Sequence, residues 1–139
     1  MRVIREVRPQ RVVTWSPEWN WQRFRSCHPD HRATGESTLD AIYPDAGNPF
    51  AHLPLLEEAG LKAWTVAEGW LLNSPNPNHY VDVTETFDRK VAAVQAHASQ
   101  VGNRENLAEE LRRRIASNSV RAGLPADRLV EAFQVVATG

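Results

Sequence analysis

The stretch that decides the fold is residues 1–15, MRVIREVRPQRVVTW. Val3, Ile4 and Val7 recur at helical spacing until Pro9, which predicts the last turns of a helix. Residues 11–15 follow at once as a short β-branched run, typical of a buried strand. A helix that leads directly into a strand is part of an αβ unit, so this stretch predicts the α/β class.

The same alternation continues through the remaining sequence. We expect loops over 16–29 and 43–50, and a closing segment over 129–136 that is compatible with a helix or, as we favour, a strand over 133–136. Asp82 and Glu85 have the spacing of a capping box. The other predicted helices lie at about 30–43, 53–60, 87–101 and 106–117, and the other predicted strands at 62–72 and 79–84. Three or four strands interleaved with helices indicate a layered sheet with flanking helices, whose strand order the pattern leaves open.

Length and composition set the broad class. The 139 residues fit one domain, residues 1–139, with 42% hydrophobic and 24% charged residues. A net charge of −1 gives no global field that recruits nucleic acid or an anionic membrane. Cys27 is the single cysteine, so an intrachain disulfide and a cysteine-based zinc cluster are both excluded. With neither a signal-peptide pattern nor a membrane-length apolar run, we expect a cytoplasmic protein.

The stretch CHPDHR, residues 27–32, carries the best candidates for chemistry. Neutral imidazole is a common zinc ligand, so His28 and His31 suit a metal site at the start of a helix. One histidine can instead donate to a developing oxyanion, with Asp30 orienting an imidazole. The alternative is a helix cap, in which Pro29 occupies the first turn and Asp30 complements the helix dipole.

A longer stretch carries a family resemblance. Residues 27–50, CHPDHRATGESTLDAIYPDAGNPF, resemble the downstream motif of the PIG-L (LmbE-like) deacetylases. Residues 4–18, 78–100 and 108–136 resemble the segments that surround this motif, so the resemblance covers nearly the whole chain. It implies a Rossmann-like layered sheet that lacks the first βα units of the family.

The resemblance also implies an activity: zinc-dependent hydrolysis of an N-acetyl group from an N-acetylglucosamine-containing small molecule. His31 then falls on the metal ligand. His28 falls on the histidine that faces the substrate carbonyl, where it stabilises the oxyanion or protonates the leaving amine, and Asp30 supports it. These roles make His28 and Asp30 the expected catalytic residues, with Zn²⁺ as the expected cofactor.

One motif of the family, His-Pro-Asp-Asp-Glu, is missing. It supplies two further zinc ligands and the general base, whereas no histidine and no aspartate precede His28 here. A single imidazole holds zinc poorly, because affinity comes from several prearranged donors. The rival expectation is therefore a non-catalytic, truncated remnant or an assembly-dependent protein without metal. We also expect pairing with another chain, either as a homo-oligomer or with a separate polypeptide that supplies the missing half of the site.

Other residues allow weaker interpretations. His52, His79 and His97 are expected to be structural, and Cys27 a small semi-buried thiol. Residues 15–25, WSPEWNWQRFR, combine aromatic and basic side chains, which suits single-stranded nucleic acid, a sugar ring, or packing against the missing half. The net charge argues against nucleic acid. We therefore expect an N-acetylated amino-sugar conjugate as the partner, with no nucleic acid and no membrane span.

Overall fold

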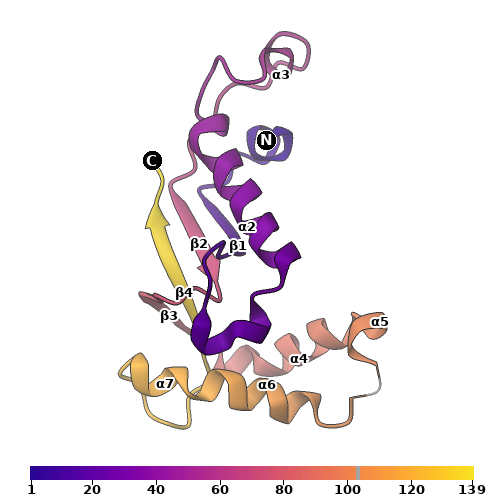
Figure 1. Cartoon of the computed structure of the whole chain (residues 1–139), viewed down its shortest axis with the longest axis vertical. Coiled ribbons are helices and arrows are strands. Elements are labelled where there is room, and N and C mark those ends of the chain that lie inside the picture. The colour runs from indigo at the N-terminus through magenta and orange to yellow at the C-terminus, as the bar shows by residue number, and fades with distance from the viewer. Residues whose placement is uncertain (103) are drawn as a thin grey trace. The chain divides into compact units, whose positions relative to one another are not determined.

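The computed structural model describes residues 1–102 and 104–139 (Figure 1). It contains both helices and strands, as the α/β prediction requires. In chain order the elements are α1 (Arg2–Val7), β1 (Arg11–Trp15), η1 (Trp21–Ser26), α2 (Pro29–Asp40), η2 (Ala41–Ala46), α3 (Leu53–Glu57), β2 (Glu68–Leu72), β3 (His79–Asp82), η3 (Thr84–Thr86), α4 (Phe87–Gln95), α5 (Ala98–Val101), α6 (Leu107–Ala116), α7 (Asn118–Arg121) and β4 (Val130–Ala137).

Four strands form one mixed sheet in the order β1-β2-β4-β3. β1 and β2 are parallel, with Trp15 opposite Leu72 at their carboxyl ends. β4 runs antiparallel to β2, which confirms that the ambiguous segment near residue 133 is a strand. β1 is an edge strand in this order and Val13 is largely exposed, so the expectation of a buried strand there was wrong.

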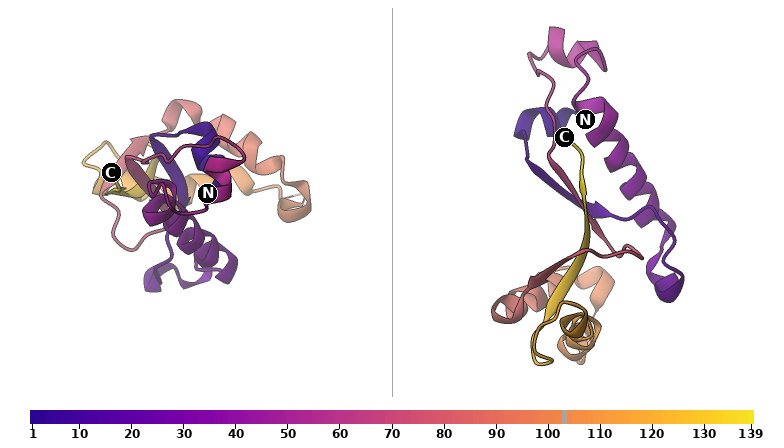
Figure 2. Two further views of the ribbon diagram at one scale, coloured as in Figure 1. Left: turned by 90° about the horizontal axis from the view of Figure 1, so that it is seen from above. Right: turned by 90° about the vertical axis from the view of Figure 1, so that its left-hand side faces the viewer.

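The chain divides into two compact units. The first contains residues 1–78 and 133–139, and the second contains residues 79–132. In the first unit the chain passes along β1, turns through η1 and returns along α2, which lies on one face of β1 and β2 (Figures 1 and 2). This return brings the start of α2 to the edge of the sheet where the parallel strands end.

Each unit has its own apolar core. The core of the first unit contains Ile4, Ile42, Ala46 and Val66, with Trp64 and other partly buried residues packed against it. The core of the second contains Phe87, Ile115 and Leu129. Burial of such side chains is the main favourable contribution to folding, roughly 1.5–3 kcal/mol for each large one.

The junction between β1 and α2 depends on a glycine. A Cβ on Gly35 would lie 2.3 Å from the carbonyl oxygen of Trp15, well inside van der Waals contact. α2 therefore approaches the end of β1 as closely as its backbone allows. This close approach places the first turn of α2 beside the last residue of β1.

Several local predictions differ from the structure. The strand expected over 62–72 is confined to β2, Glu68–Leu72. The stretch expected to be a loop contains the 3₁₀ turn η1. Its N-cap is Asn20, whose side chain accepts a hydrogen bond from Arg23 N–H. The helix expected over 87–101 is broken near His97 into α4 and α5. The capping box is wrong: Asp82 accepts hydrogen bonds from the backbone and hydroxyl of Thr84, two residues away, in an Asx-type turn.

Candidate functional site

The start of α2 holds the two histidines of the HPDH motif. His28 is the N-cap, and its Nδ1 accepts a hydrogen bond from the backbone N–H of Asp30 at 3.3 Å. Pro29 is the first helical residue, where its missing N–H costs nothing. These residues therefore do form a helix cap. Both imidazoles also lie at the carboxyl ends of β1 and β2.

His31 is held by two contacts. Its imidazole stacks on the indole of Trp15, with ring centroids 3.9 Å apart and planes within 1° of parallel. Its Nδ1 lies 3.4 Å from the carbonyl oxygen of Ser26. A proton on Nδ1 completes that hydrogen bond and leaves the lone pair on Nε2, which is the arrangement of a metal-binding histidine oriented by a backbone carbonyl.

The two imidazoles favour opposite tautomers. Because Nδ1 of His28 accepts a hydrogen bond, the neutral ring carries its proton on Nε2. His28 thus offers an N–H donor where His31 offers a lone pair, and the two ring centroids are 5.7 Å apart. The carboxylate of Asp30 lies 3.5 Å from Nδ1 of His28, so it becomes the partner of that nitrogen when the ring is protonated.

The loops around the histidines are tied together by residues that the sequence analysis did not single out. Asn73, just after β2, donates to the same Ser26 carbonyl that faces His31. Asn20 is buried and donates to the carbonyls of Asn73 and Ser74. Their position at the carboxyl ends of the predicted strands is the signal that could have identified Trp15 and Asn73.

Cys27 is part of this framework. Its Sγ accepts a hydrogen bond from the backbone N–H of Asn20, and the side chain is buried. The thiol that was expected to be semi-buried is therefore buried.

The structure offers one candidate metal ligand at this site, His31. Among residues 1–102 and 104–139, histidine, cysteine, aspartate and glutamate side chains nowhere form a group of three or more that could hold a metal ion. The tautomer and orientation of His31 fit a single ligand, but a complete zinc site needs at least three protein ligands. His52 lies beside Asp45, with 3.4 Å between Nε2 and Oδ2, which fits a structural role.

The two imidazoles lie beyond the carboxyl ends of parallel strands, which is where ligands bind in open α/β sheets. Several known proteins with sequence similarity to this chain are deacetylases. The chain is 32% identical to a 1D-myo-inositol 2-acetamido-2-deoxy-alpha-D-glucopyranoside deacetylase of Rhodococcus jostii, over 71% of this chain and 41% of the relative. It is 31% identical to the diacetylchitobiose deacetylase of Thermococcus kodakarensis, over 70% and 34% of the two chains.

Solved structures agree on the fold. The N,N'-diacetylchitobiose deacetylase from Pyrococcus horikoshii superposes with a TM-score of 0.80 and 24% identity, over 97% of this chain and 48% of that one. The protein TT1542 from Thermus thermophilus superposes with a TM-score of 0.67 and 22% identity, over 96% and 54%. These likenesses confirm the mixed α/β fold with flanking helices.

No protein-family model matches the chain. The homologues are nevertheless consistent: they are deacetylases of N-acetylglucosamine-containing compounds. The chain spans about two fifths of the length of these curated relatives. In the part of the chain that the structure describes, there is no helix of the length and apolarity that a membrane crossing requires.

Proposed function

We propose that this chain carries the HPDH half of a PIG-L-type deacetylase centre that hydrolyses the N-acetyl group of an N-acetylglucosamine conjugate. The observation that carries the proposal is the pairing of His28 and His31. Their rings lie 5.7 Å apart at the carboxyl ends of parallel strands, one with an N–H donor and one with a free lone pair. The homology to deacetylases supports the same reaction.

In this proposal His31 is a zinc ligand through Nε2, while Ser26 orients its ring. When bound, zinc supplies Lewis-acid activation of the amide carbonyl and lowers the pKa of a coordinated water to about 7. The remaining ligands and the general base come from outside these 139 residues, since His31 is a single donor. Activity therefore belongs to the complete centre.

His28 acts on the substrate itself. Its Nε2–H donates to the carbonyl oxygen as negative charge develops there, or the protonated ring gives its proton to the departing nitrogen. Asp30 supports the protonated ring through Nδ1. Hydrolysis breaks the amide C–N bond, with the hydroxyl of water joining the acetyl group and a proton joining the amine.

The proposed substrate is a glycoside or conjugate of N-acetylglucosamine rather than the free sugar. The names of the relatives support this class, because their substrates attach inositol, malate or a second sugar to an N-acetylated glucosamine.

The test is a chimera in which this chain replaces the matching segment of the Rhodococcus jostii relative. We expect the chimera to bind zinc and to release amine from an N-acetylglucosamine conjugate. His31→Ala removes both properties, whereas His97→Ala, which alters a histidine elsewhere in the chain, keeps both.

Two outcomes contradict the proposal. One is a folded chimera whose zinc content is unchanged by His31→Ala. The other is a folded chimera that takes up no zinc and stays inert with added zinc. The second outcome favours the rival function, a non-catalytic or assembly-dependent protein without bound metal.

A further inference from the structure

Three aromatic side chains beside the histidine site form a cluster of stacked rings, here named the aromatic platform: Trp19, Trp21 and Phe24. Their ring planes lie within 15° of one another. The centroids are 5.4 Å apart for Trp19–Trp21 and Trp19–Phe24, and 6.1 Å apart for Trp21–Phe24. In a single column centred on Trp19, the centroids of Trp21 and Phe24 would be nearly twice 5.4 Å apart. The three centroids therefore form a triangle, and the near-parallel rings are offset from one another.

The platform is exposed although it is apolar. Trp21 and Phe24 are 73% and 56% exposed. Large aromatic surface in water is unfavourable unless something covers it, and exposed apolar patches with polar rims mark binding sites. The surrounding sequence supplies such a rim, because Glu18, Arg23 and Arg25 flank the rings and are exposed.

Buried polar groups hold the platform in place. Asn20, between the two tryptophans, uses its side chain to bond the carbonyls of Asn73 and Ser74 and the backbone N–H of Arg23. Its own backbone N–H donates to the buried Cys27. The exposed rings are therefore carried by a preorganised turn, which reduces the entropy that a ligand has to overcome.

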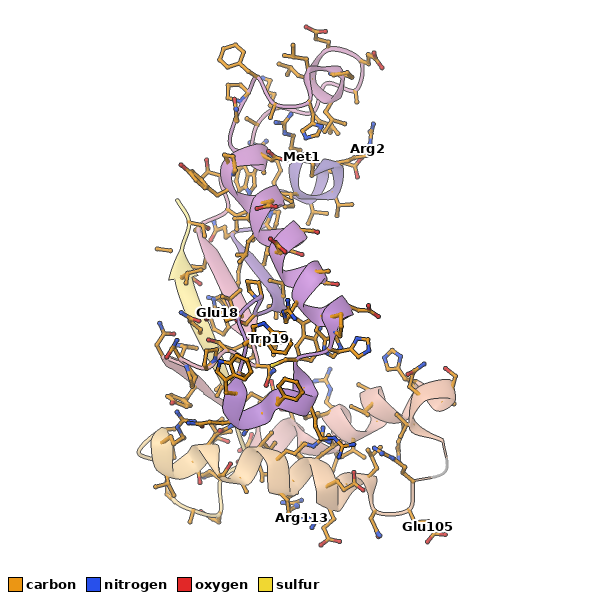
Figure 3. All side chains as sticks on the ribbon, viewed as in Figure 1. Met1, Arg2, Glu18, Trp19, Glu105 and Arg113 are labelled. Carbon is orange, nitrogen blue, oxygen red and sulfur yellow. The ribbon has the colours of Figure 1, made fainter. Side chains whose placement is uncertain are left out.

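The platform borders the histidine site. The guanidinium of Arg32 lies 4.0 Å from the centre of the Trp19 ring, and Arg32 directly follows His31. Figure 3 labels Glu18 and Trp19 on the segment that leads from β1 into η1, close to the start of α2. A ligand with one end at His28 and His31 thus has the platform as its neighbouring surface.

We propose that the aromatic platform is a carbohydrate subsite, on which the group attached to N-acetylglucosamine stacks when that group is a second pyranose ring. This proposal rests on the proposed function. The C–H face of a pyranose is apolar and as broad as an aromatic ring, while its hydroxyl groups stay in water at the rim. Because Arg32 covers one face of Trp19, the exposed Trp21 and Phe24 are the rings that receive the sugar.

The experiment measures binding of N,N'-diacetylchitobiose and N-acetylglucosamine to the 139-residue chain by NMR, with a chelator present. We expect the disaccharide to bind more tightly than the monosaccharide and to shift the indole N–H signal that Trp21→Phe removes. Trp21→Ala should weaken disaccharide binding roughly three- to tenfold, the size of a lost aromatic contact. Trp21→Phe keeps a ring and should retain most of the affinity.

Phe50→Ala is the matched control, since Phe50 is an exposed aromatic residue outside the platform and should leave binding unchanged. Equal affinities of Trp21→Ala and the unaltered chain for the disaccharide would overturn the inference. Indole shifts with a thymidine oligonucleotide but with neither sugar would also overturn it. This binding measurement needs neither metal nor hydrolysis, so it can be interpreted even if the proposed deacetylase function is wrong. Conversely, a platform that binds no sugar leaves the zinc and activity tests of His31 unaffected.

Discussion

The imidazole of His31 lies flat on the indole of Trp15, with centroids 3.9 Å apart. Trp15 is the last residue of β1, and His31 lies in the first turn of α2. The contact therefore fixes the ring at the edge of the sheet where the parallel strands end. Together with the Ser26 carbonyl it restricts both the rotation of the ring and the nitrogen that carries the proton.

The first prediction concerns these protons. At about pH 8, where an ordinary histidine is neutral, we expect His31 to carry its proton on Nδ1 and His28 to carry its proton on Nε2. The Ser26 carbonyl lies beside Nδ1 of His31 and can only accept a hydrogen bond, whereas the backbone N–H of Asp30 donates to Nδ1 of His28. Long-range ¹H–¹⁵N NMR of the side chains measures both tautomers. The same tautomer at both rings would contradict the structural assignment.

The second prediction separates the roles of the two histidines in the chimera described above. His28→Ala should lower kcat roughly 10²–10⁴-fold, the usual contribution of a general acid or base. Zinc content should stay unchanged, because His28 is proposed to contact substrate and not metal. Metal analysis beside the activity assay checks both. Loss of zinc in this variant would make His28 a ligand and refute the division of roles.

The third prediction concerns the close approach of α2 to β1. Gly35→Ala should destabilise the chain by about 1–3 kcal/mol, because its Cβ would lie 2.3 Å from the backbone oxygen of Trp15. Gly47→Ala is the matched control, since Gly47 has a φ of −80° and its nearest neighbour would be 3.5 Å away. Urea unfolding measures both. A similar effect of the two substitutions would mean that the two elements do not approach so closely.

The fourth prediction concerns the core of the second unit. Phe87 is 3% exposed and packs with Ile115 and Leu129. Phe87→Ala should cost about 3–5 kcal/mol, through lost burial and the cavity left behind. Val120→Ala, at a residue 74% exposed in α7, should stay within about 0.5 kcal/mol. Urea unfolding measures both variants. Equal unfolding midpoints for Phe87→Ala and Val120→Ala would show that this core is absent.

The fifth prediction concerns acid. The hydroxyl and backbone N–H of Thr84 donate to Asp82, and with a smaller effect of Arg128 they hold the pKa of this carboxyl below 3.8. A pKa lowered by folding contributes stability that is present above the unfolded value and is lost as pH falls through the folded value. The gap in melting temperature between the unaltered chain and Asp82→Asn should therefore shrink from pH 6 to pH 3. An equal gap at both pH values would contradict this.

Local spacing in the sequence predicted most elements, because a helix or strand is specified by side chains a few residues apart. The strand over residues 11–15 matches β1 residue for residue, and the amphipathic helix over 106–117 matches α6 within one residue at either end. The HPDH motif likewise placed His28 and His31 at the start of a helix. The role of each histidine in the reaction stays a prediction.

What the sequence by itself determined, then, is the α/β class, the order of the elements and the position of the two histidines. Only the tertiary structure decided which side of α1 is buried: Val3 and Val7 are exposed, while Arg5 is enclosed and donates to the carbonyls of Asp45, Asn48 and Ala51. It also decided that Trp15 supports His31 and that Asn73 reaches Ser26. The physical reason is that these contacts join segments far apart in the chain, whose meeting depends on strand pairing and not on local periodicity.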